Sequence, residues 1–198
     1  MLTPCLGRDQ AQQSLATALE DARWVSIIGP PGSGKTLLAR HVTSDHPNRA
    51  WVDARHLRRL DDLLTECLAA LDAETAPGDT LPGALGRAFD GQGCLLVLDG
   101  LDLDATGAAD ALRDILEATS DSKVVITSTA AAGSPGERVI RVGPLPVPHQ
   151  RAALSGPAVE LFLDRIQSAG GHPVDLATQG ADIRRLLSAT GGLPLLIE

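Results

Sequence analysis

Short apolar runs alternate along much of the chain with segments in which apolar residues recur every three or four positions. Runs of the first kind are typical of buried strands, and spacing of the second kind is typical of amphipathic helices. The predicted strands cover residues 24–28, 49–53, 94–99, 123–127 and 138–142. The predicted helices include residues 11–22, 37–40, 60–71, 81–89 and 112–116, with Gly91 ending the fourth. This alternation predicts an α/β domain whose parallel sheet is covered on both faces.

The chain changes character after the fifth predicted strand. Pro144, Pro146 and Pro148 stand at every second position, a spacing that neither a central strand nor a helix tolerates. Pro157 suits a first helical position, and apolar residues then recur at helical spacing up to a last apolar segment that looks truncated. The sequence therefore predicts a first domain over 1–143, a proline-rich linker over 144–156 and a partial helical subdomain, or lid, over 157–198.

Composition excludes several classes of partner. The 198 residues carry a formal net charge of −8, which makes the chain a poor candidate for nonspecific binding to nucleic acid or anionic membranes. The basic cluster at 55–59, RHLRR, reads as a solvated loop or helix start. No stretch approaches the roughly 18 apolar residues of a membrane span, and no signal-peptide pattern is present. Because the three cysteines show no paired or metal-binding spacing, we expect buried thiols and a cytoplasmic location.

Residues Gly29 to Thr36 read GPPGSGKT and fit the pattern G-x-x-x-x-G-K-[ST] of a phosphate-binding loop. Glycines let backbone N–H groups turn towards an anion without a clash at Cβ, and the following helix adds its positive end. Lys35 supplies a charge for the β- and γ-phosphates, and Thr36 offers a hydroxyl to Mg²⁺. A buried strand before the loop and a helix after it provide the required context, so we predict binding of a nucleoside triphosphate.

Asp99 is the candidate acid that holds Mg²⁺, because it closes an apolar strand and would face the loop across the carboxyl edge of the sheet. Hydrolysis also needs a group that orients or deprotonates water. In many such ATPases an acid follows the metal-holding aspartate, but Gly100 stands there in this chain. Asp102, and less strongly Asp104, lie close enough to substitute, although Asp102 is equally well explained as a loop or helix-capping residue. The candidate catalytic residues are Lys35, Asp99 and Asp102.

The strand that ends in Thr127 and Ser128 offers hydroxyls at the same edge of the sheet. Either one is a candidate for sensing the γ-phosphate. The alternative is that both hydroxyls cap backbone groups at the end of the strand.

In this order, the segments resemble the STAND class of signalling ATPases, specifically the NB-ARC or apoptotic-ATPase-like domain of bacterial LuxR/AfsR-type transcriptional regulators. The matching segments are LGRD at 6–9, GPPGSGKTLLA at 29–39, LLVLDGLD at 95–102, ITST at 126–129, VGPLP at 142–146, PAVELF at 157–162 and GGLPLL at 191–196. The similarity covers almost the whole chain.

This resemblance implies a P-loop NTPase fold, a three-layer αβα arrangement around a five-stranded parallel sheet of order 5-1-4-3-2, followed by the partial helical subdomain. It implies Mg²⁺-dependent binding of ATP or ADP, with slow or absent hydrolysis, in a switch that controls self-association through the nucleotide-binding domain. It also implies a base or phosphate contact for Arg8 and packing of Pro194 on the base. We expect no direct contact with nucleic acid and none with a membrane. The candidate nucleotide contacts are Arg8, Gly29, Pro30, Pro31, Gly32, Ser33, Gly34, Lys35, Thr36, Leu37, Thr127, Ser128 and Pro194, and the candidate metal ligands are Thr36 and Asp99.

Two departures from the family pattern bear on hydrolysis and switching. The family's TSR strand usually ends in an arginine that reads the γ-phosphate, and Thr129 stands in that place. Loss of such a cation costs several powers of ten in rate, judging by the roughly 10³–10⁵ effect of an arginine finger. The chain also ends before the winged-helix segment whose histidine holds the β-phosphate of ADP in this family.

Two other functions compete with the nucleotide-gated switch. One is a turnover enzyme, such as an AAA-type motor ATPase or a small-molecule kinase, although the Ala-rich segment at 130–137 is unlike an arginine-rich kinase lid. The other is a degenerate domain that binds nucleotide for stability or serves as an interaction scaffold. Gly100 and Thr129 favour this last function a little.

Overall fold

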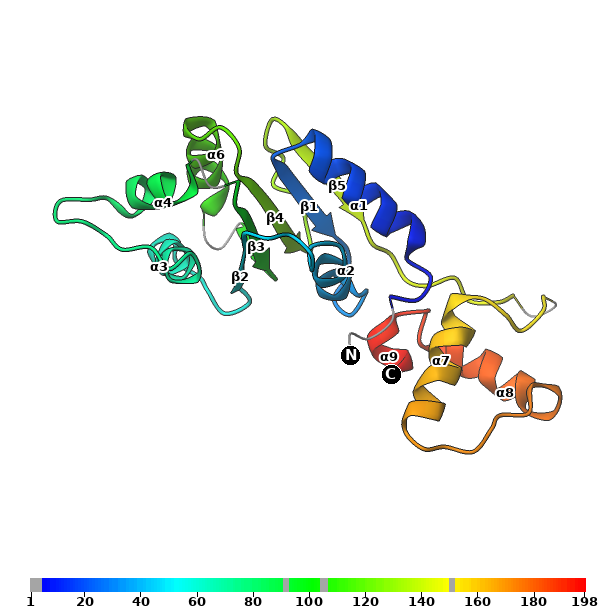
Figure 1. Cartoon of the computed structure of the whole chain (residues 1–198). Coiled ribbons are helices and arrows are strands. Elements are labelled where there is room, and N and C mark those ends of the chain that lie inside the picture. Colours follow the sequence, from blue (N-terminus) through cyan, green and yellow to red (C-terminus); the bar gives the residue numbers. More distant parts are fainter. Residues whose placement is uncertain (1–4, 91–92, 104–106, 150–151) are drawn as a thin grey trace.

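Five parallel strands form one sheet in the order β2-β3-β4-β1-β5, which confirms the predicted fold and strand order read from the other edge (Figure 1). The computed structural model describes residues 5–90, 93–103, 107–149 and 152–198, so Asp104 and Gly91 lie outside the described residues. The strands are β1 (Trp24–Ile28), β2 (Arg49–Asp53), β3 (Leu95–Asp99), β4 (Lys123–Ser128) and β5 (Glu137–Arg141).

Helices cover both faces of the sheet, as Figure 1 shows. One face packs against α1 (Asp9–Asp21) and α2 (Lys35–Val42), and the other packs against α3 (Leu60–Ala70), α4 (Leu81–Phe89) and α6 (Ala108–Ala118). Because successive side chains of a strand point to opposite faces, Leu96 and Leu98 of β3 join the second core while Leu95 and Val97 join the first. The continuous apolar runs therefore mark strands that are buried from both sides.

Burial distinguishes the central strands from the edge strands. Every residue of β1 and β3 is buried, whereas the edge strands β2 and β5 contain exposed and half-buried residues. Each fully buried Leu, Ile or Val contributes about 1.5–3 kcal/mol to folding relative to an exposed one. The core consists largely of these residues, as expected of a chain in which only 2% of residues are aromatic.

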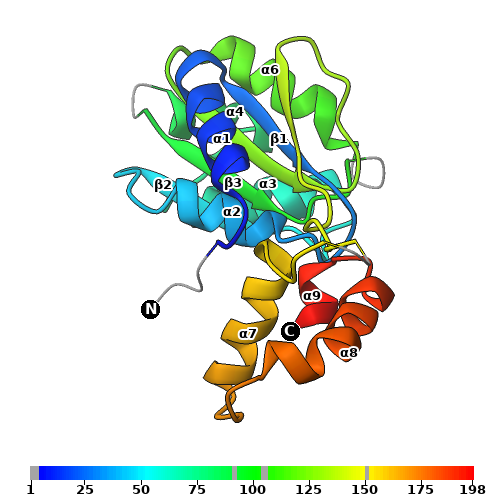
Figure 2. The ribbon, with the colours of Figure 1, turned by 90° about the vertical axis from the view of Figure 1, so that its right-hand side faces the viewer.

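A group of helices follows the proline-rich segment and packs around its own apolar cluster, which includes Leu145, Val159, Leu161 and Leu187. These helices are α7 (Pro157–Ser168), α8 (Leu176–Ala189) and α9 (Pro194–Ile197). Figure 2 shows them gathered below the sheet, beside the turn that follows β1. No helix in the described ranges has the length and apolar character needed to cross a bilayer.

Two close contacts hold these helices against the proline-rich segment and the glycine-rich loop. Gly192 has a φ of +74°, and a Cβ built on it would lie 2.1 Å from the carbonyl oxygen of Leu145. The backbone N–H of Leu145 donates to the carbonyl oxygen of Gly192 at 2.8 Å. The backbone N–H of Leu195 donates to the carbonyl oxygen of Gly32 at 3.2 Å. The start of α9 is thereby fastened directly to the glycine-rich loop.

Candidate nucleotide-binding site

The segment Gly29–Thr36 joins β1 to α2 and turns sharply at two glycines. Gly32 and Gly34 have φ values of +78° and +93°, a left-handed conformation in which glycine avoids the strain of a Cβ. Gly29 lies so close to the strand-end backbone that an added Cβ would be 2.0 Å from the carbonyl oxygen of Val142. The Ser33 hydroxyl is buried and has no hydrogen-bond partner among the described residues. This combination gives a tight backbone cradle with an unsatisfied polar group.

Lys35 lies at the centre of this cradle. Its Nζ donates to the carbonyl oxygens of Gly29 and Pro30 at 2.9 and 3.0 Å. Burial lowers the pKa of Lys35, and the charge of Asp99 partly offsets that effect. A partly desolvated ammonium gains more from a neighbouring oxyanion than a solvated one does. The geometry therefore suits an anionic phosphate beside Lys35.

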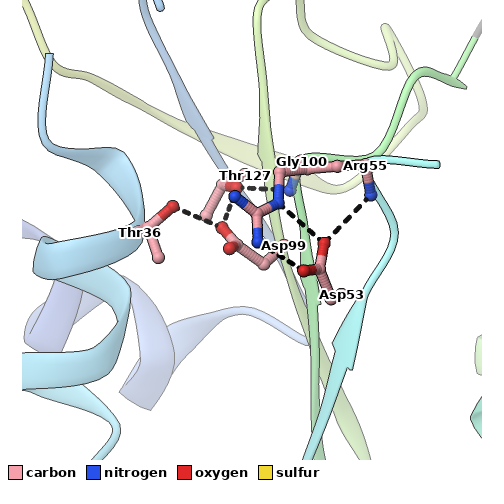
Figure 3. Close-up of polar contacts among 6 residues, drawn as sticks. All are labelled: Thr36, Asp53, Arg55, Asp99, Gly100 and Thr127. Atoms are coloured by element: carbon pink, nitrogen blue, oxygen red, sulfur yellow. Dashed lines mark hydrogen bonds and ion pairs between the residues drawn. The ribbon is translucent and has the colours of Figure 1, made fainter. Parts of the chain in front are cut away.

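Asp99 ends β3 and is held by two threonines from different elements (Figure 3). Its Oδ1 accepts hydrogen bonds from the hydroxyls of Thr36, at the start of α2, and Thr127, on β4, both at 2.7 Å. The Thr127 hydroxyl in turn accepts from the N–H of Gly100 at 2.7 Å. Asp99 is only 2% exposed, so this network fixes a nearly dry carboxylate next to the glycine-rich loop.

The donor set fits Mg²⁺ better than a transition metal. Thr36 and Asp99 offer a hydroxyl and a carboxylate, and Mg²⁺ is usually held by one or two protein oxygens together with water and substrate phosphates. Within the described ranges there is no cluster of three or more His, Cys, Asp or Glu side chains that suits a metal. Thr36 and Asp99 would hold the ion, and it would neutralise phosphate charge when bound.

Arg8 ties the loop to the segment that follows β5. Its Nη2 donates to the carbonyl oxygens of Ser33 and Gly143 at 2.8 and 2.6 Å. Burial lowers the pKa of this guanidinium. Arg8, Leu145, Leu161 and other residues line a small cavity of about 30 Å³, which we call the linker-side hollow. Its walls are mostly apolar, and its volume is close to that of one water molecule.

A larger cavity of about 450 Å³, the phosphate-side hollow, lies next to it and is lined by residues that include Lys35, Thr36 and Arg55. The two hollows share four lining residues, which are Gly34, Leu37, Pro194 and Glu198. Together they form one cleft between the sheet and the helices. Another cavity, of about 580 Å³, lies around Arg23 and Trp24 at the start of β1 and includes none of the motif residues. We assign the site to the linker-side and phosphate-side hollows because residues of the glycine-rich loop line both of them.

The structure places other predicted residues at varying distances from this cleft. Thr127 and Ser128 are buried and line neither hollow; the Thr127 hydroxyl bonds Asp99, and Ser128 Oγ accepts from Ala130 N at 3.4 Å. Asp102 is exposed and lines neither hollow. Pro30 and Pro31 are exposed on the loop. The roles predicted for these residues in sensing, hydrolysis and binding remain predictions.

Sequence reasoning missed four lining residues of the phosphate-side hollow, which are Arg40, Arg55, Leu195 and Glu198. Arg40 lies on α2, with its guanidinium 4.8 Å from the centre of the Trp51 ring. Arg55 belongs to the basic cluster that was assigned to a solvated loop or helix start, and it is exposed. The signal for Arg55 was its position two residues past the end of a predicted strand, at the edge where the other site residues meet.

Comparisons with known proteins show the family and the fold of the chain. Residues 4–127 match the AAA ATPase domain family. A protein of Mycobacterium tuberculosis is 32% identical over 211 residues, and the chain spans about half the length of that relative, 50% of it. Among solved structures, the Walker-type ATPase of Pyrococcus abyssi has a TM-score of 0.71 at 15% identity, covering 97% of this chain and 65% of its own. A STAND protein with a tetratricopeptide repeat sensor from Pyrococcus horikoshii has a TM-score of 0.62 at 18% identity. The match covers 97% of this chain and 29% of that protein. At such identities the two structures are similar in fold alone.

Proposed function

Because the chain belongs to the AAA ATPase domain family, we propose that it is a nucleotide-gated switch of the STAND type. It binds ATP or ADP with Mg²⁺, hydrolyses ATP slowly or not at all, and uses the bound nucleotide to control self-association. Residues 1–143 act as the nucleotide-binding domain, 144–156 as the linker and 157–198 as the lid. Within the class we favour an NB-ARC-like domain of a bacterial LuxR/AfsR-type regulator acting in the cytoplasm, on the motifs LGRD, PAVELF and GGLPLL.

The observation that carries this proposal is the composition of the cleft. Lys35 and Thr36 come from the sheet domain, whereas Pro194, Leu195 and Glu198 come from the last helix and its end, and all of them line one hollow. A nucleotide in that hollow contacts both parts of the chain at once. A ligand shifts an equilibrium between two packings by its differential affinity for them, and the γ-phosphate supplies such a difference between ATP and ADP.

The alternative is an AAA-type ATPase with real turnover. Slow hydrolysis is favoured over it because Gly100 follows Asp99 and because the exposed Asp102 lines neither hollow. A steady-state assay separates the two functions. We expect the switch to turn over well below about one ATP per second, near the bottom of the usual enzyme range. A faster rate would favour the alternative.

Two further measurements test the switch itself. Either nucleotide at about 100 times its Kd should raise the free energy of unfolding by about 2.7 kcal/mol, measured by thermal or chemical denaturation. Sedimentation of the chain with ATP and with ADP should give different oligomer distributions. Stabilisation by both nucleotides with identical sedimentation would leave a nucleotide-binding scaffold and exclude the switch.

A further inference from the structure

Asp53 and Arg55 form a polar pair beside the phosphate-side hollow that the proposed function does not use. Asp53 ends β2 and is the register partner of Asp99 on β3. The next residue, Ala54, donates its N–H to the carbonyl oxygen of Asp99 at 2.8 Å. Arg55 follows directly and lines the same hollow as Lys35 and Thr36. The chain therefore brings a cation to the metal-holding edge of the sheet from outside the recognised motifs.

Gly100 makes room for this cation. A Cβ built on Gly100 would lie 2.2 Å from Cγ and 3.2 Å from Cδ of Arg55. The aliphatic stem of Arg55 thus crosses the main chain at the position where sequence analysis looked for an acid. Any side chain at position 100 would push the stem aside, so Gly100 and the placement of Arg55 depend on each other.

Asp53 orients the guanidinium of Arg55 through two hydrogen bonds (Figure 3). Its Oδ1 accepts from Nε of Arg55 at 2.8 Å, and its Oδ2 accepts from Nη2. This fork fixes the plane of a group that has five N–H donors, and Asp53 engages it along one edge. The side chain of Arg55 is 61% exposed, so a second oxyanion has access to it.

The order of the strands shows which phosphate Arg55 would meet. The linker-side hollow adjoins Arg8 and Leu145, next to β5 at one edge of the sheet, and Arg55 follows β2 at the opposite edge. A nucleotide whose base contacted the linker-side end of the cleft and whose phosphates passed Lys35 and Thr36 would extend towards Arg55. The group that reaches Arg55 is then the one farthest from the base.

We propose that Arg55, positioned by Asp53, binds the terminal phosphate of a nucleoside triphosphate and so distinguishes ATP from ADP. The proposal rests on the proposed function, because it needs a nucleotide in this cleft. In this role Arg55 supplies a cation like the arginine that the family pattern has at position 129. Thr129 carries no charge, is exposed and lines neither hollow. Arg40 is the other arginine lining this hollow, and its guanidinium stacks on Trp51.

The test compares Arg55→Ala with Arg58→Ala, an exposed arginine of the same loop that bonds backbone carbonyls of Arg55 and Leu57. Calorimetry measures the affinity of each variant for Mg²⁺-β,γ-methylene-ATP and for Mg²⁺-ADP. Loss of a charged hydrogen bond should weaken binding of the triphosphate to Arg55→Ala about ten- to a hundredfold. ADP affinity should change by less than about twofold, as should both affinities of Arg58→Ala.

An equal loss for both nucleotides in Arg55→Ala, or no loss for either, would overturn the role of Arg55. The exposed pair contributes little to folding, so Arg55→Ala is expected to remain folded. Arg55→Lys gives a second reading, because it keeps the charge and loses the fork; it should retain part of the preference for the triphosphate. If the unaltered chain bound neither nucleotide, the proposed function would itself fail, a result distinct from unselective loss in a chain that binds both.

Discussion

At the scale of single residues, the site depends on one buried carboxylate. Asp99 accepts hydrogen bonds from Thr36 and Thr127 on the same oxygen, and each threonine comes from a different element. A buried charge without partners is costly, so the two hydroxyls stabilise the carboxylate of Asp99. They also hold it next to the glycine-rich loop. Thr127 therefore has a positioning role that is independent of any contact with phosphate.

Replacing Thr127 with Val should lower the free energy of unfolding by about 1–3 kcal/mol, since the carboxylate loses a donor and the N–H of Gly100 loses its acceptor. Thr129→Val is the matched control, because Thr129 is exposed one step beyond the strand and should change stability by no more than about 0.5 kcal/mol. Urea denaturation of both variants measures the difference. Equal stability of the two variants would show that the hydroxyl of Thr127 does not support Asp99.

The residues of the glycine-rich loop and Asp99 were predictable from the sequence. Each belongs to a motif whose residues follow one another within one short segment. Arg55 has no such spacing. It reaches the site only because β2 pairs with β3 in parallel and ends at the same edge. The contact between Gly100 and Arg55 joins two segments far apart in the chain, and no local pattern predicts it. A residue that reaches the site through strand pairing, as Arg55 does, could therefore not be predicted from the sequence alone.

At the scale of elements, the sheet was predictable because its strands are short, apolar and bounded by polar residues. The whole of β3 is buried, and its apolar run has no other reasonable structure in an α/β chain. The edge strand β5 begins at Glu137, one residue before the predicted start at 138, because half-buried strands carry a weaker pattern. The helix expected around 112–116 begins earlier, at Ala108.

The docking of α9 gives a prediction at this scale. Gly191 and Gly192 both have positive φ, but only at Gly192 would a Cβ meet backbone, the carbonyl oxygen of Leu145. Both alanine variants carry the left-handed strain of about 1–2 kcal/mol. Gly192→Ala should cost about 1–3 kcal/mol more than Gly191→Ala, because it also overpacks the contact between linker and helices.

Chemical denaturation of the two variants measures this difference, and nucleotide affinity gives a second readout. Gly192→Ala should also bind nucleotide more weakly, since Pro194 and Glu198 line both hollows. Identical stability and affinity of the two variants would mean that the docking of α9 does not depend on this close approach.

At the scale of the whole molecule, the cleft lies between two groups of elements with separate apolar cores. The change of structure at the proline-rich segment was predictable because proline spacing is a local pattern. The packing of the helices against the sheet was not predictable, since the hydrogen bond between Leu195 and Gly32 joins distant segments. The relation between the two groups is therefore what the structure adds, and it is also what makes a nucleotide able to act on both.

The most direct test of this account is the affinity of the chain for Mg²⁺-ATP before and after Lys35→Ala, measured by calorimetry. Loss of one charged hydrogen bond, worth about 1.5–3 kcal/mol, should weaken binding about ten- to a hundredfold. Lys123→Ala is the control, because it removes the chain's other lysine, at the start of β4, and should leave the affinity unchanged. Equal affinities of the two variants, or no binding by the unaltered chain, would contradict a nucleotide site at the glycine-rich loop.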